Sequence, residues 1–275
     1  MTKWLNLQDK VVVVTGAVGG MGTKFTEDFA AQGSKVVLMD LLEDKLNTRA
    51  KELADRYGIE TLAIVANATK EDEVNAAVAK VVATFGRVDI LVNTAAILRF
   101  SPLEDLSVDE WRTAVDINLN GYFITSQAFG KQMIKQKSGT MVHISTVAGI
   151  FPETYSGAYS TTKAGVLMMS KQMAAEWGQF GIRSNCVLPC LVETPMSHAF
   201  YTDPEVQKGR SRLVASKRIG KLEDISNAVL YLASDRSDYT NGAELRVDGG
   251  LSIMMQDMIP KPGGRRQYAI DHHQK

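Results

Sequence analysis

The stretch KVVVVTGAVGGMG, residues 10–22, decides the fold. Four consecutive valines predict a strand that is buried on both faces, as strands of parallel sheets are. The strand runs into a loop in which Gly16, Gly20 and Gly22 have the spacing of a turn that lets backbone approach a pyrophosphate and then opens a helix. The N–H groups at the start of that helix would face the phosphates. We therefore expect a dinucleotide-binding βα unit, and the alternative is an ordinary βα turn.

The same alternation of short apolar runs and amphipathic stretches continues along the chain. Runs typical of strands cover residues 10–15, 35–40, 61–66, 88–93, 140–145, 183–188 and 244–247. Helical patterns cover residues 20–32, 42–57, 71–85, 107–135, 156–180 and 222–234. The alternation predicts the α/β class: a single doubly wound (Rossmann) domain over residues 1–257, with a parallel seven-stranded sheet flanked by helices. Residues 258–275 are polar and rich in Pro and Gly, and we expect them to form a C-terminal tail.

The bulk composition limits the partners and the compartment. The 275 residues carry no net charge, which favours neither a nucleic-acid partner nor an anionic membrane surface. No apolar run approaches the roughly 18 residues of a membrane span, and the first residues lack the apolar segment of a secretion signal. Cys186 and Cys190 form neither a zinc pattern nor a redox motif, so we expect a cytoplasmic protein. His272 and His273 have no third ligand nearby in sequence, so no metal site is expected.

One carboxylate indicates which dinucleotide the fold would hold. Asp40 ends the second predicted strand, where a carboxylate accepts hydrogen bonds from ribose hydroxyls and repels a 2′-phosphate. No Lys or Arg lies in the glycine loop or directly after Asp40, and Lys24 lies one turn into the helix. These residues favour NAD over NADP. The alternative is that Asp40 only caps the next helix.

Tyr159 and Lys163 lie four positions apart, and therefore on one face of a predicted helix. A free tyrosine has a pKa near 10, and a neighbouring ammonium lowers it, so Tyr159 would exchange a proton with an alcohol or a ketone. Alone, this spacing is common on helix surfaces. Ser145, at the end of a predicted strand, and Asn118, within a predicted helix, add polar groups at the carboxyl edge where such sheets bind ligands.

With these motifs in place, the chain resembles the classical short-chain dehydrogenases/reductases over about residues 7–251. The family motif TGxxxGxG corresponds to residues 15–22. Its catalytic residues correspond to Asn118, Ser145, Tyr159 and Lys163. The resemblance implies that Tyr159 is the acid/base and that Lys163 also binds the nicotinamide ribose. It implies that Ser145 orients the substrate and Asn118 holds a proton-relay water.

The resemblance also implies a homotetramer built on the two long helices, and contacts to the nicotinamide amide from Val192 and Thr194. We expect the following residues to bind the cofactor: Gly16, Val18, Gly20, Met21, Gly22, Asp40, Leu41, Asn67, Ala68, Asn93, Ala95, Tyr159, Lys163, Pro189, Val192 and Thr194. Three positions depart from the family pattern. Ala96 and Cys190 replace glycines, which puts the local backbone in doubt, and Asn67 replaces an acidic residue near the adenine.

The substrate end is mostly apolar, which suits an uncharged or bulky secondary alcohol, and residues 195–215 would form a lid. We expect substrate contacts from Ile97, Val147, Phe151, Glu153, Tyr155, Leu191 and Met196. A phosphorylated substrate would need cations, for which the candidates are Arg99, Lys208, Arg210 and Arg212. The leading hypothesis is an NAD-dependent oxidoreductase that interconverts a secondary alcohol and a ketone. The alternatives are an NADP-dependent carbonyl reductase, a sugar-alcohol-phosphate dehydrogenase and a non-catalytic NAD-binding module.

Overall fold

Seven parallel strands form one sheet in the order β3-β2-β1-β4-β5-β6-β7 in the computed structural model, which describes residues 3–195 and 197–260. The strands are β1 (Val11–Thr15), β2 (Lys35–Asp40), β3 (Thr61–Val65), β4 (Ile90–Asn93), β5 (Gly139–Ile144), β6 (Ile182–Pro189) and β7 (Glu244–Val247). The direction of winding reverses between β1 and β4, which pair in parallel. Loops that leave the two strands therefore diverge and open a crevice at their carboxyl ends.

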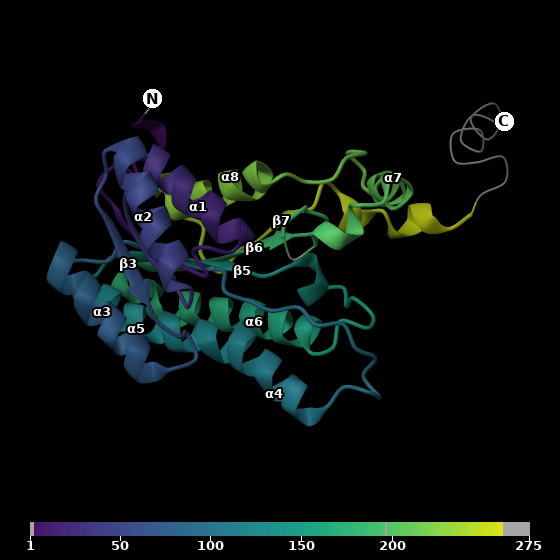
Figure 1. Cartoon of the computed structure of the whole chain (residues 1–275), viewed down its shortest axis with the longest axis horizontal. Helices are drawn as coiled ribbons and strands as arrows, with labels where there is room; N and C mark the ends of the chain where they lie inside the picture. The colour runs from purple at the N-terminus through teal and green to yellow at the C-terminus, as the bar shows by residue number, and fades with distance from the viewer. Residues whose placement is uncertain (1–2, 196, 261–275) are drawn as a thin grey trace.

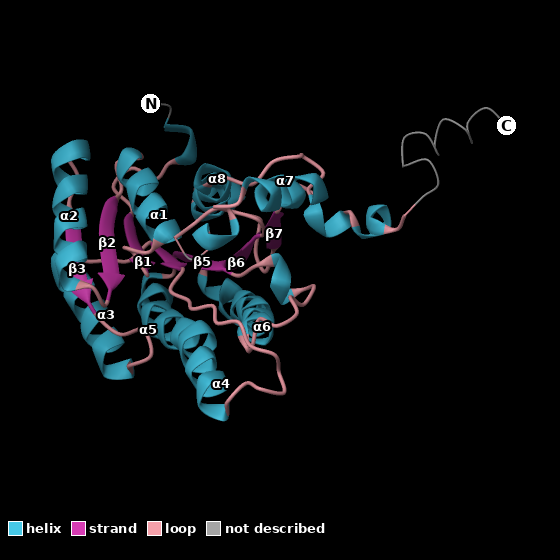
Figure 2. Cartoon of the chain, turned by 45° about the vertical axis from the view of Figure 1, so that its right-hand side comes forward, coloured by secondary structure: helices cyan, strands magenta, loops and turns pink. Residues whose placement is uncertain are grey.

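Helices cover both faces of the sheet (Figures 1 and 2). On one face lie α1 (Gly20–Ala31), α2 (Glu43–Tyr57) and α8 (Leu222–Ala233). On the other lie α3 (Glu71–Phe85), α4 (Val108–Val115), α5 (Gly121–Gln136) and α6 (Tyr159–Trp177). Valines that alternate along β1 point to opposite faces, so Val12 joins Phe25 in one buried cluster and Val13 joins Phe129 in the other. The predicted fold class is thus confirmed.

The helix expected over residues 107–135 is interrupted, in contrast to the prediction. Ser107 caps α4, accepting a hydrogen bond from the Glu110 N–H, as the sequence motif predicts. A π-helical segment, η2 (Asp116–Asn120), then separates α4 from α5. Segments of this kind are frequent at functional sites because they re-aim side chains. Here the segment contains Asn118, which was predicted to lie in a regular α-helix.

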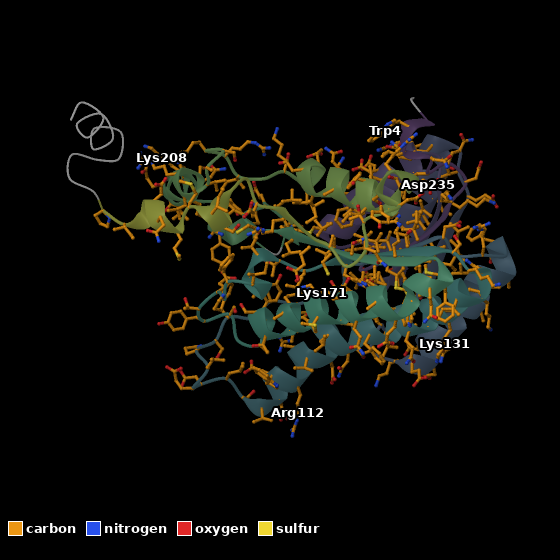
Figure 3. The ribbon with its side chains drawn as sticks, turned by 180° about the vertical axis from the view of Figure 1, so that it is seen from behind. Trp4, Arg112, Lys131, Lys171, Lys208 and Asp235 are labelled. Atoms are coloured by element: carbon orange, nitrogen blue, oxygen red, sulfur yellow. The ribbon has the colours of Figure 1, made fainter. Side chains whose placement is uncertain are left out.

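The two ends of the sheet carry different structures. At the amino ends of the strands, Arg236 donates from Nε to the Trp4 carbonyl at 2.5 Å, and its guanidinium carbon lies 5.4 Å from the centre of the Trp4 ring. At the other end of the molecule lies α7 (Pro204–Leu213), which carries Lys208 and belongs to the segment predicted as a lid (Figure 3). Most of the predicted tail, residues 261–275, lies outside the described residues, as do His272 and His273. Within the part of the chain that is described, no helix is long and apolar enough to cross a membrane.

Candidate active site

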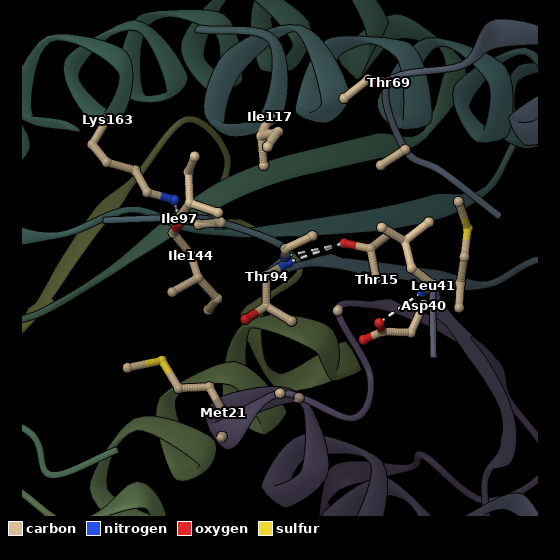
Figure 4. A pocket seen from close by; sticks show the side chains of 18 of the residues that line it. Thr15, Met21, Asp40, Leu41, Thr69, Thr94, Ile97, Ile117, Ile144 and Lys163 are labelled. Carbon is tan, nitrogen blue, oxygen red and sulfur yellow. Dashed lines mark hydrogen bonds between the residues drawn. The ribbon is translucent and has the colours of Figure 1, made fainter. Parts of the chain in front are cut away.

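A pocket of about 760 Å³ opens at the carboxyl ends of β1, β2, β4 and β5. Asp40 and Leu41 lie at one end of it and Lys163 and Ile144 at the other (Figure 4). Of the residues predicted to bind a cofactor, the pocket is lined by Gly16, Gly20, Met21, Gly22, Asp40, Leu41, Asn67, Ala68, Ala95, Tyr159, Lys163, Pro189 and Thr194. The topology therefore brings most of a scattered set of residues into one elongated cavity.

The glycine loop forms the floor of this pocket. Gly16 has a φ of +64°, and a Cβ there would lie 2.9 Å from the Ala95 Cα, so only glycine fits between the loop and the segment after β4. A Cβ on Gly20 would lie 2.5 Å from the Pro195 Cδ. Gly19 caps α1 without a side-chain hydrogen bond, so the first N–H groups of α1 have no side-chain partner. This cradle of bare backbone at a helix N-terminus fits the pyrophosphate of a dinucleotide.

Asp40 is anchored at the pocket rim by backbone donors. Its Oδ2 accepts from the Val18 N–H at 3.2 Å, and its Oδ1 accepts from the Leu41 N–H at 2.7 Å. These bonds fix the orientation of the carboxylate and leave further lone pairs for ribose hydroxyls. Lys24 is turned away, because its Nζ pairs with Asp28 at 2.9 Å and with Glu223 at 3.3 Å.

The pocket wall beyond Asn67 contains two residues that were not predicted from the sequence, Thr69 and Lys70. Asn67 accepts from both the Thr69 N–H and the Thr69 hydroxyl through Oδ1, so only its amide nitrogen remains to meet an adenine. The only signal for Thr69 and Lys70 was that they follow the predicted residues Asn67 and Ala68 directly. Lys70 and Lys163 are the two cations among the described lining residues.

Three residues predicted to bind the cofactor do not line the pocket. Asn93 is buried in a polar network, where it donates to Ser126 at 2.9 Å and accepts from Thr125 at 2.9 Å, so it holds the end of β4 in place. Val192 is buried, with 5% of its surface exposed. Val18 packs against the core, and its N–H donates a hydrogen bond to the Asp40 carboxylate. Sequence spacing could not separate residues that support the pocket from those that line it.

Tyr159 and Lys163 meet at the pocket wall, but the electrostatics differ from the expectation. The Lys163 Nζ lies 5.9 Å from the centre of the Tyr159 ring and donates to the Ile144 carbonyl at 2.8 Å. Burial raises the pKa of Tyr159 to about 12, and Glu153 acts in the same direction. Burial also lowers the pKa of Lys163 to about 7. The protein groups alone therefore raise the pKa of Tyr159 above its ordinary value, in contrast to the expected lowering, and desolvation is the largest cause.

Ser145 follows β5 and, like Tyr159, lines the pocket. Its hydroxyl donates to the Lys163 carbonyl at 2.9 Å. Since a hydroxyl has one proton and two lone pairs, Ser145 in this orientation can accept a hydrogen bond from an alcohol. Donation to a ketone requires the hydroxyl to rotate away from Lys163.

Asn118 is fully buried, and its side chain is engaged by protein groups. Its Oδ1 accepts from the Ile97 N–H at 2.8 Å. Its Nδ2 donates to the Ile97 carbonyl at 2.9 Å and to the Thr162 hydroxyl at 3.4 Å. The side chain thus ties the loop after β4 to α6, and the expected role of Asn118 in holding a relay water stays a prediction. Thr113, Asp116 and Ile117, which precede it, line the pocket and were not predicted.

The predicted substrate residues are mostly placed outside the pocket wall. Ile97 lines it. Val147 does not, because it packs in a buried cluster with Tyr122 and Leu188. Four others do not line the pocket and are exposed or partly exposed: Phe151, Glu153, Tyr155 and Leu191. Met196 lies outside the described residues. None of the four cations considered for a phosphate, Arg99, Lys208, Arg210 and Arg212, lines the pocket.

The two substitutions of family glycines leave the backbone intact. Ala96 and Cys190 both line the pocket, and neither has a positive φ. An L-residue therefore adopts the local conformation without strain. Burial raises the pKa of the Cys190 thiol to about 11, so the thiol is neutral at physiological pH.

Comparison with known proteins agrees with this geometry. The sequence model described as Enoyl-(Acyl carrier protein) reductase matches residues 16–252. The chain belongs to the classical short-chain dehydrogenase/reductase family. The 3-oxoacyl-[acyl-carrier-protein] reductase FabG of Thermotoga maritima is 36% identical, over 90% of this chain and 100% of its own. The D-threitol dehydrogenase of Mycolicibacterium smegmatis is 34% identical, over 90% and 94%.

A solved relative shares both the fold and the cofactor class. A gluconate 5-dehydrogenase from Burkholderia cenocepacia, in complex with NADP and tartrate, is 31% identical, with a TM-score of 0.86 over 90% of this chain and 96% of its own. This short-chain dehydrogenase/reductase is accordingly an oxidoreductase that uses a nicotinamide cofactor, NAD or NADP. The alternative of a binding module without catalysis is set aside.

Proposed function

We propose that this enzyme interconverts a secondary alcohol and a ketone with NAD as cofactor, and that Tyr159 is the acid/base. The observation that carries the proposal is the pocket itself. Tyr159, Ser145 and Lys163 line one end, and a fixed carboxylate, Asp40, lies at the other. A dinucleotide laid along the glycine floor would place its adenosine ribose near Asp40 and its nicotinamide near Tyr159.

The residues at the nicotinamide end define the proton chemistry. Ser145 accepts a hydrogen bond from the substrate hydroxyl, which orients the oxygen toward Tyr159. The Tyr159 phenolate would take the hydroxyl proton as the substrate C–H bond breaks, and NAD held along the glycine floor would supply the hydride acceptor. In the reverse direction the Tyr159 phenol donates the proton. In the bound complex, the Lys163 ammonium and the positive charge of the nicotinamide would both favour the phenolate and oppose the effect of burial.

The preference for NAD is supported by the charges around the adenosine end. Asp40 cannot turn away from a 2′-phosphate without losing its backbone bonds, and Lys24 is paired with acidic partners. Lys70 is the observation that favours NADP as the second candidate, because it lines the pocket near Asn67. A direct comparison of the two cofactors distinguishes them.

The proposed substrate is an uncharged secondary alcohol, because Ile97 and Ile144 line the pocket and the cations considered for a phosphate do not. The threitol dehydrogenase relative supports a polyol. We also propose a homotetramer, because Phe123 on α5 and Met168 on α6 expose 46% and 63% of their surfaces. The free thiols of Cys186 and Cys190 support a cytoplasmic location.

The test is formation of NADH from a panel of polyols, hydroxy acids, steroids and cyclic alcohols, followed by absorbance. Tyr159→Phe should lower kcat by roughly 10²- to 10⁴-fold, the range for loss of a general acid/base. Tyr57→Phe is the matched control, because its hydroxyl bonds Glu27 far from the pocket. A Tyr159→Phe enzyme with wild-type turnover would remove Tyr159 from its role.

A further inference from the structure

Tyr122 is a buried tyrosine that contacts Lys163 without lining the pocket. It is the second residue of α5, directly after the π-helical segment, and only 2% of its surface is exposed. Its hydroxyl donates to the Ile144 carbonyl at 3.0 Å and accepts from the Lys163 Nζ at 3.0 Å. The same Nζ lies 4.5 Å from the centre of the Tyr122 ring. The phenol therefore meets the ammonium with both its oxygen and its π-face.

Lys163 depends on these contacts because no described carboxylate pairs with it. Its two described hydrogen-bond acceptors are neutral, the Ile144 carbonyl and the Tyr122 hydroxyl. An ammonium has three N–H donors, so one donor remains for a group in the pocket. Figure 4 shows the Lys163 side chain reaching to Ile144 at the wall.

We propose that Tyr122 is a positioning residue for the reaction: its hydroxyl holds the Lys163 ammonium at the end of β5 and keeps it charged beside Tyr159. The proposal rests on the proposed function of Tyr159. Tyr122 does not line the pocket, and the described hydrogen bonds of its hydroxyl go to the Ile144 carbonyl and Lys163, so the proposed effect on the reaction runs through Lys163.

The charges of the groups around Lys163 determine how far its ammonium depends on the Tyr122 hydroxyl oxygen. These groups are Tyr159 on the same helix, Tyr122 on α5, His143 on β5 and Cys186 on β6. Burial lowers the pKa of His143 to about 3 and raises that of Cys186 to about 12, so both are neutral at physiological pH. Burial likewise raises the pKa of Tyr122 well above 10. Since none of these groups is an anion, loss of the Tyr122 hydroxyl oxygen removes one of the two described hydrogen-bond acceptors of the Lys163 ammonium and favours its neutral amine form.

The primary test is Tyr122→Phe, which keeps the ring and removes only the oxygen. We expect kcat to fall by roughly tenfold or more with KM for the substrate unchanged. The alkaline limb of the pH profile of kcat for ketone reduction should move to lower pH by about one unit, since the Lys163 ammonium loses its proton more readily. NADH affinity measured by fluorescence should also weaken at mildly alkaline pH. Tyr57→Phe, which loses a bond of 3.0 Å to Glu27, is the control for the loss of a tyrosine hydroxyl.

A double-mutant cycle separates this role from general packing. NADH affinity is measured for Tyr122→Phe, Lys163→Met and the double variant, together with the thermal midpoint of each. If Tyr122 acts through Lys163, adding Tyr122→Phe to Lys163→Met changes the affinity no further. Additive losses, or an unmoved alkaline limb in a folded Tyr122→Phe enzyme, would overturn the proposal. Because the binding cycle needs no turnover, its result is independent of whether Tyr159 proves to be the acid/base.

Discussion

Replacing Asp40 by Asn tests the choice of cofactor at a single atom. The amide has the shape of the carboxylate and still accepts the Leu41 N–H through its oxygen, but its NH2 group cannot accept the Val18 N–H, so the longer of the two backbone bonds is lost. The second change is the loss of the negative charge that faces the 2′ position of the adenosine ribose. NADP carries a phosphate there, and NAD carries a hydroxyl.

The magnitude follows from the position of Asp40, which is partly buried at the pocket rim. Two unit charges about 4 Å apart repel by about 1 kcal/mol in water and about 4 kcal/mol at the effective dielectric constant of a protein surface. Removing the carboxylate should therefore raise kcat/KM for NADP by roughly 5- to 10³-fold. For NAD, a charged acceptor becomes a neutral one, which costs about 1 kcal/mol, or roughly fivefold.

The assay compares kcat/KM for NAD and NADP with one alcohol at low and high salt, because added salt screens the repulsion. Asp44→Asn is the matched control, since this exposed carboxylate lies in the first turn of α2 and does not line the pocket. The reasoning is refuted if the wild type already prefers NADP, or if Asp40→Asn leaves the ratio of the two cofactors unchanged.

Two further predictions concern stability. Gly22→Ala should destabilise the fold by about 3 kcal/mol, the upper end for overpacking, because the new Cβ would lie 2.0 Å from the Gly16 carbonyl oxygen. Gly209→Ala is the control, because it adds its Cβ in open space on α7 and should be neutral or stabilising. Equal midpoints of urea unfolding for the two variants would contradict this prediction. Because the pKa of Lys163 is about 7 in the folded chain and its ordinary value is 10.5, this residue binds more protons in the unfolded chain between these pH values, so its contribution to the free energy of unfolding, taken as wild type minus Lys163→Met, should rise with pH by up to about 1.4 kcal/mol per unit. Lys163→Met should lack this rise in urea unfolding between about pH 7 and pH 9, where Tyr159, with a pKa of about 12, does not titrate.

The sequence alone predicted the fold class and which residues meet at one edge of the sheet. Four valines and a glycine loop determine a buried strand and a phosphate turn, because both depend on interactions within a few residues. Parallel strands then bring their carboxyl ends to one edge, which places Asp40, Ser145 and Tyr159 in one cavity without further information.

Tertiary structure decided the rest, because burial and partners depend on residues far apart in the chain. Asn93 and Asn118 are polar residues at the expected positions, yet their side chains bond other protein groups, which no spacing rule distinguishes from ligand binding. The pKa of Tyr159 rises rather than falls because desolvation is a property of the packed core. The contact between Tyr122 and Lys163 joins positions 41 apart on two helices, and only the packing of α5 against the end of β5 brings them together.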